Sequence, residues 1–150
     1  YRFATAFGLS QRLRLDLLIN DFVWQCVKNR QLVVYEADAR RTFIHVTDMA
    51  DSFVFALDNY VNMKGDVFNV GGESMNHTKR EIATKIVDKV GGFLWFAEIG
   101  SDPDKRDYEV SYEKIRNLGF HISVDLDKGI DELIRGYQMV TIRNPFSNME

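Results

Sequence analysis

The chain has 150 residues, of which 45% are hydrophobic and 13% aromatic, and its formal net charge is −3 at pH 7. This length suits one domain with a hydrophobic core, and the excess of acidic residues argues against binding to a nucleic-acid backbone as the main function. The sequence contains no apolar run of about 18 residues and no apolar segment typical of a signal peptide. We therefore expect a cytoplasmic protein that does not enter a membrane.

The first half of the chain alternates segments typical of strands with segments typical of helices. Residues 1–7, "YRFATAF", have the alternation of a buried strand. A helix is predicted over about 16–28, with Asp16 as its N-cap and the single cysteine, Cys26, in the core. Two strands follow, "QLVVYE" at 31–36 and "RTFIHV" at 41–46.

Thr47 is expected to cap the next helix, and Gly65 to end it. The apolar positions of this helix occupy one face: Met49, Ala50, Phe53, Val54 and Leu57. A short strand, "DVFNVGG" at 66–72, then closes on a pair of glycines.

The clearest helix of the sequence lies in "HTKREIATKIVDKVGG", residues 77–92. Thr78 and Glu81 have the spacing of a capping box, and Gly91 stands where a left-handed C-terminal cap is expected. A strand at 93–99, a short helix at about 111–117 that stops at Gly119, and a last helix at about 125–139 follow. Alternating strands and helices indicate the α/β class, and the aperiodic tail, 143–150, is expected to be disordered.

Several catalytic and metal-binding motifs are absent from the sequence. The pair Gly71–Gly72 lacks the third glycine of a dinucleotide-binding turn and is interpreted as a tight turn. Neither a nucleotide P-loop, nor a G-x-S-x-G elbow, nor cysteines and histidines at metal-binding spacing occur, so no metal site is predicted. His45 lies in an apolar segment and is interpreted as a core histidine. Tyr60 and Lys64 form a Y-x-x-x-K pair, which we do not interpret as catalytic because it stands at the end of a helix beside Gly65.

Five segments, taken in order, carry a resemblance to a known family. They are "RFATAFG" (2–8), "LVVYE" (32–36), "RTFIHVTDMA" (41–50), "FNVGG" (68–72) and "DKRDYEVSYEKIRNLGF" (104–120). The pattern resembles the extended short-chain dehydrogenases/reductases (SDRs), specifically the NAD-dependent sugar-nucleotide epimerase/dehydratase family. The combination of R-x-[FY]-I-H-V-x-D with the later R-x-Y-x-V-x-x-x-K-I-x-x-L-G-F makes the resemblance specific.

The resemblance implies that the chain corresponds to the C-terminal, substrate-binding half of such an enzyme. Residues 1–142 would contain the last Rossmann strands and a small mixed α/β substrate-binding domain. In the family, the glycine-rich NAD turn and the catalytic Ser with Y-x-x-x-K precede the strand that begins here at Tyr1. We therefore expect no catalytic residue in this chain, a missing N-terminal partner that covers its first strand, and a homodimer for the full-length protein. NAD or NADP would bind the full-length protein and would not bind this fragment strongly.

The resemblance also assigns site residues. The arginine at the position of Arg41 contacts the diphosphate of a nucleotide-diphosphate sugar in relatives, and a planar guanidinium suits this because it binds two anionic oxygens at once. Its alternative is a surface ion pair with Asp38 or Asp48. Arg106 resembles the second arginine of the clamp. Other positions are expected to contact the nucleotide base (Leu32, Val33 and Val34, with plain core as the alternative), the substrate (Thr5) and the cofactor near nicotinamide (Ala6 and Phe7).

For the full-length enzyme, the resemblance implies that a tyrosine removes a hydroxyl proton while NAD accepts hydride from the same sugar carbon, which gives a transient keto sugar. Epimerases, dehydratases and decarboxylases diverge after that step, and epimerase is the commonest activity of the family. One alternative is a non-catalytic module that binds a nucleotide or a protein partner. A nucleic-acid binder is the other, based on Arg12, Arg14, Arg40 and Arg41, and the net negative charge disfavours it.

Overall fold

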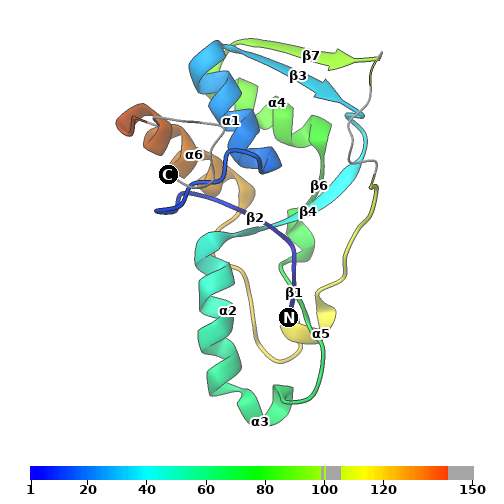
Figure 1. Cartoon of the computed structure of the whole chain (residues 1–150). Helices are drawn as coiled ribbons and strands as arrows, with labels where there is room; N and C mark the ends of the chain where they lie inside the picture. Colours follow the sequence, from blue (N-terminus) through cyan, green and yellow to red (C-terminus); the bar gives the residue numbers. More distant parts are fainter. Residues whose placement is uncertain (99, 101–105, 142–150) are drawn as a thin grey trace.

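A computed structural model of the chain describes residues 1–98, 100 and 106–141. Parallel strand pairs dominate it, in agreement with the predicted α/β class (Figure 1). These pairs are β1 (Arg2–Phe3) with β5 (Asn69–Val70), β2 (Thr5–Phe7) with β4 (Arg40–His45), and β3 (Gln31–Tyr35) with β7 (Phe93–Ala97). β6 (Asn76–Thr78) runs antiparallel to β4 and completes the central β2–β4–β6 sheet.

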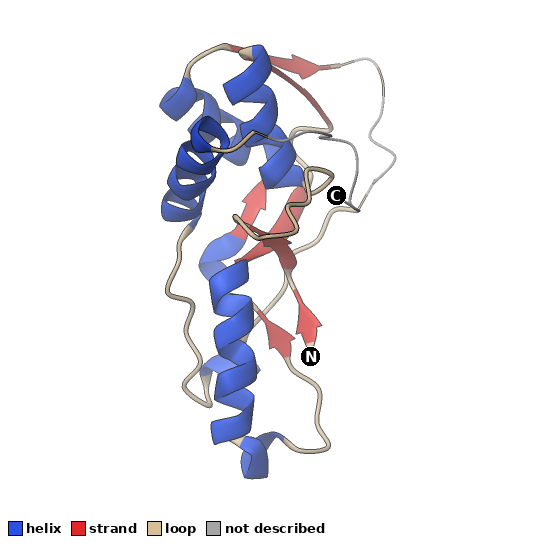
Figure 2. Cartoon of the chain, turned by 60° about the vertical axis from the view of Figure 1, so that its left-hand side comes forward, coloured by secondary structure: helices blue, strands red, loops and turns tan. Residues whose placement is uncertain are grey.

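The helices divide between the two ends of the molecule. They are α1 (Leu18–Asn29), α2 (Val46–Asp58), α3 (Tyr60–Met63), α4 (Lys79–Val90), α5 (Glu113–Arg116) and α6 (Leu126–Met139), with a 3₁₀ turn, η1, at Glu73–Met75. α1, α4 and α6 lie together with β3 and β7 at one end, whereas α2, α3 and α5 lie with β1 and β5 at the other. Figure 2 shows the central strands between these two ends.

Each end has its own hydrophobic core. The larger cluster is built from α1, α4, α6 and β3, and it includes Ile19, Val23, Ile82, Ile86 and Leu133, all fully buried. Cys26 belongs to it and is 1% exposed, which confirms the expectation from the sequence. The smaller cluster joins β4, β5 and the segment around α5, and its members are Ala4, Ile44, Met63, Phe68, Val70, Tyr112, Ile115 and Phe120. Each buried aliphatic or aromatic side chain of this kind stabilises the fold by about 1.5–3 kcal/mol relative to an exposed one.

The structure confirms one of the predicted helix caps and contradicts two others. The capping box of α4 is confirmed, because the Thr78 side chain accepts from the Glu81 N–H and the Glu81 carboxylate accepts from the Thr78 N–H. Two predicted caps are wrong. α1 begins at Leu18 without a side-chain cap, because Asp16 instead accepts hydrogen bonds from the Arg14 guanidinium. α2 begins at Val46, and its cap is His45, whose Nδ1 accepts from the Thr47 N–H.

Two predicted backbone features also differ from the structure. The segment "YRFATAF" forms two short strands that pair with different partners, β1 with β5 and β2 with β4. Gly91 has the expected positive φ of 75°, but its ψ of 168° is not that of the left-handed helix. The extended ψ leads the chain directly into β7, where the Phe93 N–H donates to the Arg30 carbonyl.

The glycine pair after β5 has a role other than the predicted tight turn. Neither glycine has a positive φ. A Cβ on Gly71 would lie 2.6 Å from Cζ of the buried Tyr112 ring, and one on Gly72 would lie 2.8 Å from Cδ1 of Ile122. Gly71 is therefore needed because a buried ring lies against the backbone, whereas at Gly72 the neighbour is the flexible end of the Ile122 side chain.

The apolar face predicted for α2 is largely open to solvent. Its buried residues are the polar Asp48 and Ser52, and Asp48 accepts hydrogen bonds from the backbone N–H groups of Ser123 and Val124. Phe53, Val54 and Leu57 are 54%, 58% and 76% exposed. Within the described ranges, no helix has the length and apolar content needed to cross a bilayer. The tail predicted to be disordered, 143–150, lies outside the described residues.

Candidate functional site

A cavity of about 540 Å³ opens between the β2–β4 strands, the start of α1 and the C-terminal end of β3. Its lining combines charged groups of both signs with aromatic and aliphatic side chains. The lining residues are Thr5, Asp16, Leu17, Leu18, Asp21, Phe22, Val33, Val34, Tyr35, Arg41, Phe43, Lys79 and Arg106. Among them are five of the six residues predicted to bind substrate, namely Thr5, Val33, Val34, Arg41 and Arg106.

Arg41 lies in β4 and is only 4% exposed, although it carries a full charge. Its Nη1 donates to the Arg40 carbonyl at 2.8 Å, and its guanidinium carbon lies 5.8 Å from the centre of the Tyr108 ring. Of its alternative partners, Asp38 accepts from Arg80, and Asp48 is occupied by the backbone at Ser123 and Val124. Because Arg41 belongs to β4, the strand fixes the position of its guanidinium group in the cavity lining.

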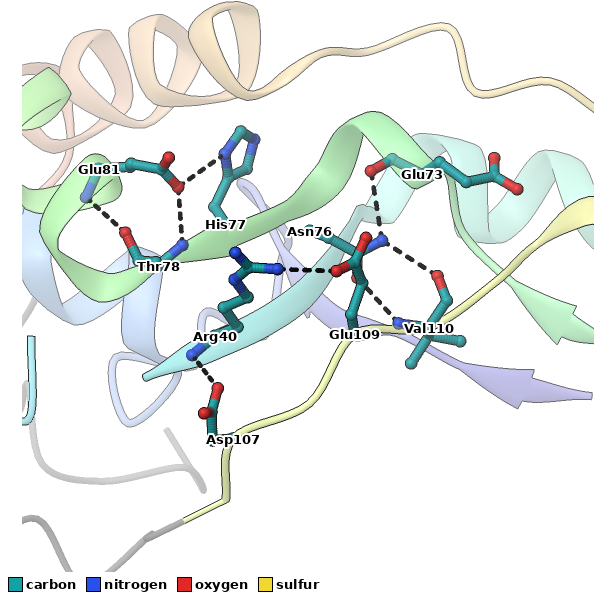
Figure 3. A network of polar contacts seen from close by, with 9 residues as sticks. All are labelled: Arg40, Glu73, Asn76, His77, Thr78, Glu81, Asp107, Glu109 and Val110. Atoms are coloured by element: carbon teal, nitrogen blue, oxygen red, sulfur yellow. Dashed lines mark hydrogen bonds and ion pairs between the residues drawn. The ribbon is translucent and has the colours of Figure 1, made fainter. Parts of the chain in front are cut away.

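A set of polar contacts holds residues 107–110 against β4 and β6 (Figure 3). The Arg40 N–H donates to Asp107 and its guanidinium to Glu109, each at 2.8 Å. Asn76 of β6 exchanges two hydrogen bonds with the Val110 backbone, at 3.0 and 3.1 Å. Because both strands belong to the central sheet, the segment that carries Tyr108 has a fixed position beside Arg41.

The same segment brings Arg106 to the cavity. Its guanidinium carbon lies 6.0 Å from the centre of the Tyr108 ring, so both predicted arginines contact one aromatic side chain. A cation at such a distance from a ring is attracted by about 0.5–1 kcal/mol at an exposed site. Tyr108 therefore acts as a spacer that keeps the two guanidinium groups at one opening, where they can bind neighbouring anionic oxygens.

The β3 wall follows the alternation of a strand. Val33 and Tyr35 are 45% and 40% exposed, whereas Leu32 and Val34 are buried. Val33, Val34 and Tyr35 all line the cavity, and Leu32 belongs to the larger core instead. Of the three residues predicted to form a wall for a base, the structure thus places two at the cavity and one in the core.

Lys79 is a lining residue that the sequence analysis missed. It is the first residue of α4 and is 1% exposed, and its Nζ donates to the Tyr35 carbonyl at 3.2 Å. Asp21 was also missed; burial raises the pKa of its carboxyl group above the usual value. The lysine lies within the capping box, between Thr78 and Glu81, but the sequence contains no signal that its side chain would be buried.

The predicted cofactor residues lie away from the cavity lining. Phe7 is 1% exposed and packs edge-on against His45, with ring centres 5.3 Å apart. Ala6 is half-buried in β2, opposite Ile44 of β4. His45 itself is 1% exposed, and its Nε2 lies 3.4 Å from a Glu132 carboxylate oxygen. The histidine thus lies in the core beside α6, and its Nε2 forms no hydrogen bond within the part of the chain that the structure describes.

The Tyr60–Lys64 pair spans α3 and its C-cap, outside the cavity lining. Tyr60 is 63% exposed. Among the residues that the structure describes, no cluster of His, Cys, Asp and Glu could hold a metal ion.

Comparison with known proteins gives the chain a family context. Residues 1–71 match the model of the NAD dependent epimerase/dehydratase family. A probable GDP-L-fucose synthase 1 from rice, Oryza sativa subsp. japonica, is 28% identical over 98 residues, which is 65% of this chain and 29% of that protein.

Several solved structures with a similar fold are sugar-nucleotide epimerases and dehydratases. UDP-glucuronic acid 4-epimerase from Bacillus cereus, in complex with UDP-glucuronic acid and NAD, is 21% identical with a TM-score of 0.77 and covers 91% of this chain. UDP-N-acetylglucosamine 4-epimerase from B. cereus is 21% identical with a TM-score of 0.76 over 97% of this chain. dTDP-glucose 4,6-dehydratase from Streptomyces venezuelae, with NAD and TYD bound, is 23% identical with a TM-score of 0.74 over 91% of this chain. The matched regions are 44%, 47% and 42% of those chains, so this chain spans less than half their length.

Proposed function

We propose that this chain is the substrate-binding part of an NAD-dependent epimerase/dehydratase, and that its cavity binds the diphosphate and base of a nucleotide-diphosphate sugar. Residues 1–142 would form this part, and a longer polypeptide would supply the NAD(P) site and the catalytic residues. The family match over residues 1–71 and the fold shared with sugar-nucleotide enzymes support the assignment to this family, whereas the assignment to its substrate-binding part is based on the cavity.

One observation carries the proposal: Arg41 and Arg106 converge on the Tyr108 ring at the wall of the same cavity. A diphosphate offers several anionic oxygens to the two planar guanidinium groups, and the aromatic and aliphatic wall at Val33 and Tyr35 offers a surface to a base.

The cavity is not expected to hold a dinucleotide. The lining includes neither Ala6 nor Phe7, and the Phe7 ring is enclosed by the core. A bound NAD(P) would exchange hydride with the sugar in the longer protein. The residues of this chain bind and orient the nucleotide half of the substrate, which fixes the direction in which the sugar leaves the cavity.

Isothermal titration calorimetry tests the proposal on the 150-residue chain. UDP, GDP and dTDP are each titrated in a separate experiment. The corresponding monophosphates, the nucleosides and NAD are titrated in the same way. We expect one nucleoside diphosphate to bind more tightly than its monophosphate and its nucleoside, and more tightly than NAD. Tighter binding of NAD than of every diphosphate would instead identify a cofactor-binding part.

Arg41→Lys provides the residue-level test, because lysine keeps the charge but cannot bind two oxygens with one planar group. We expect the affinity for the diphosphate to fall about tenfold, the loss of one charge-assisted hydrogen bond. Arg116→Lys is the matched control, since Arg116 lies outside the cavity lining and 3.4 Å from Glu73. Equal affinities in both variants and the unchanged chain would contradict the proposed role of Arg41. A chain that binds diphosphates but gives no turnover in any longer form would favour a non-catalytic module.

A further inference from the structure

Within the described residues, β7 pairs with one strand only, and its other edge lies at the margin of the molecule (Figure 1). The strand that it pairs with is β3, in a parallel ladder. The Phe93 N–H donates to the Arg30 carbonyl, so the backbone of Phe93 faces the β3 side. Because backbone groups alternate in direction along a strand, the N–H and C=O groups of Leu94 and Phe96 point away from β3, toward the free edge.

The sequence of β7 lacks the features that usually prevent a sheet edge from pairing with another chain. Residues 93–97 contain no charge and no proline, and their register with β3 is continuous, so no bulge interrupts the strand. Leu94 and Phe96 pack against the larger core. Phe93 and Trp95 project from the opposite face, where they are 60% and 56% exposed and their rings stack with centres 6.3 Å apart. The edge can therefore accept a further strand, and an exposed aromatic pair lies beside it.

The charges at the two ends of β7 favour an antiparallel copy of the same strand as the partner. The Arg30 guanidinium donates to the Val90 carbonyl at 2.8 Å, which places a cation at the N-terminal end of β7. Glu98 directly follows the C-terminal end and is exposed. Arg80, which stacks on a ring of β7, is already paired with Asp38. Two antiparallel copies bring the cationic end of each strand to the acidic end of the other, whereas two parallel copies would bring like charges together.

One register of this pairing uses all the outward backbone groups of β7. With Trp95 at a twofold axis, Leu94 of each copy lies opposite Phe96 of the other, and each of these pairs exchanges two hydrogen bonds. The two Trp95 residues then form a pair without hydrogen bonds, the type in which facing side chains approach most closely. The same register places Glu98 of each copy opposite Gly92 of the other, at its cationic end.

We propose that β7 is an interaction surface for a second copy of this chain, and that two copies join through antiparallel β7 strands with the twofold axis at Trp95. The pairing gives a continuous sheet in the order β3–β7–β7–β3. Because each copy uses the free edge of β7 of the other, this contact closes at a dimer. The interface lies within this chain and does not depend on the nucleotide proposed for the cavity.

Sedimentation velocity of the 150-residue chain over a range of concentrations tests the inference. We expect a reversible equilibrium between monomer and dimer. Trp95→Lys should weaken dimerisation about tenfold or more, because it removes the aromatic pair and places two ammonium groups opposite each other at the axis. Val61→Lys is the matched control: it introduces the same charge at an apolar side chain that is 76% exposed in α3, at the other end of the molecule, and should dimerise like the unchanged chain. A monomer at every concentration would overturn the inference, as would a dimer that Trp95→Lys leaves intact.

Disulfide cross-linking tests the register. Trp95→Cys should form a covalent dimer under mild oxidation, because facing Cα atoms about 4.5 Å apart lie within the range that a disulfide can bridge. Phe93→Cys is the control on the same face of the strand. The two copies of residue 93 would be more than about 13 Å apart along the antiparallel pair, so this variant should not cross-link. Absence of cross-linking in Trp95→Cys, or equal cross-linking of both variants, would overturn the inference.

Hydrogen exchange of the backbone N–H groups, followed by NMR, extends the test to the unchanged chain. We expect the N–H groups of Leu94 and Phe96 to exchange more slowly as the concentration rises and the dimer forms. The Phe93 N–H, which is bonded to Arg30 in either state, is the internal reference. Slow exchange of Leu94 and Phe96 in the dilute monomer would show that another segment of the same chain pairs with this edge, and would overturn the inference. Exchange that stays fast where the dimer predominates would overturn it as well.

Discussion

Tyr108 connects the two arginines of the cavity although it carries no charge. Its backbone N–H donates to the Arg40 carbonyl, and its ring lies about equally far from the guanidinium carbons of Arg41 and Arg106, at 5.8 and 6.0 Å. A guanidinium that stacks on a ring keeps its N–H groups, which point outward in its own plane, available for an anion. The tyrosine thus limits the motion of both arginines without using their donors.

Tyr108→Leu should therefore weaken diphosphate binding while both arginines remain. We expect a three- to tenfold loss of affinity, because two cation–π contacts of about 0.5–1 kcal/mol each disappear and Arg106 gains freedom. Calorimetry with the tightest-binding nucleoside diphosphate measures it, and Tyr60→Leu, at an exposed position outside the lining, is the control. Unchanged affinity would show that the strand alone orients Arg41.

Gly71 illustrates a residue whose small size is required by a neighbour. Gly71→Ala would bring a Cβ within 2.6 Å of the Tyr112 ring, which is 1% exposed and cannot move away without disturbing its 2.5 Å hydrogen bond to Thr42. We expect the free energy of unfolding to fall by about 1–3 kcal/mol, as is usual for overpacking. Urea unfolding measures this change.

A double-mutant cycle separates the clash from the intrinsic preferences of glycine. In a Tyr112→Leu background, the same Gly71→Ala change should cost much less, because the ring atoms that meet the new Cβ are gone. Equal costs in both backgrounds would attribute the effect to the backbone and would refute the role assigned to the ring.

At the scale of elements, α2 shows why the sequence predicted a helix but not its surroundings. The spacing of apolar residues predicted a helix between Thr47 and Leu57, and the structure has one at Val46–Asp58. The same spacing does not reveal which layer covers the helix. Asp48 and Ser52, the two polar residues on its inner face, are buried because Asp48 binds the backbone N–H groups at Ser123 and Val124.

Because the polar face of α2 is buried and its apolar face is exposed, a polar residue of this helix should be more sensitive to mutation than an apolar one. Leu57→Lys should change the free energy of unfolding by less than about 0.5 kcal/mol, because the side chain is 76% exposed. Asp48→Leu should cost at least about 1–3 kcal/mol, because it leaves buried N–H groups without an acceptor. Urea unfolding of both variants checks this ranking. A larger loss in Leu57→Lys than in Asp48→Leu would mean that the apolar face of α2 is covered.

At the scale of the whole molecule, local chemistry was predictable and long-range assembly was not. The capping box at Thr78 and the strand "LVVY" follow from neighbouring residues, and both are present. The parallel pairing of β3 with β7 joins segments that are far apart in the chain, and no local pattern encodes it. The candidate site also combines residues that a local motif identifies with a residue that only long-range packing brings there. Arg41 and Arg106 could be selected from their motifs, whereas Lys79 belongs to the cavity only because α4 packs against β3.

The buried thiol and phenols of both cores give the whole fold a predictable response to alkaline pH. Burial raises the pKa of Cys26 from 9.0 to about 11 and that of Tyr112 from 10.0 to about 12, and it also raises the pKa of Tyr137. All three are neutral when protonated, so above their ordinary pKa values the unfolded chain loses protons before the folded chain does. The stabilisation is complete below about pH 9 and is lost as the pH rises through the folded-state values.

We therefore expect the free energy of unfolding to stay level near pH 8 and to fall by several kcal/mol between about pH 9 and 12, since each unit of pKa shift corresponds to about 1.4 kcal/mol. Urea unfolding at successive pH values measures the curve. Cys26→Ala isolates one contribution, because this variant is less stable at pH 8 from the lost packing but has no thiol to ionise. Its curve should approach that of the unchanged chain between about pH 9 and 11, where only the unchanged chain loses the thiol contribution. Curves that stay parallel over this interval would show that the thiol is accessible to water in the folded protein.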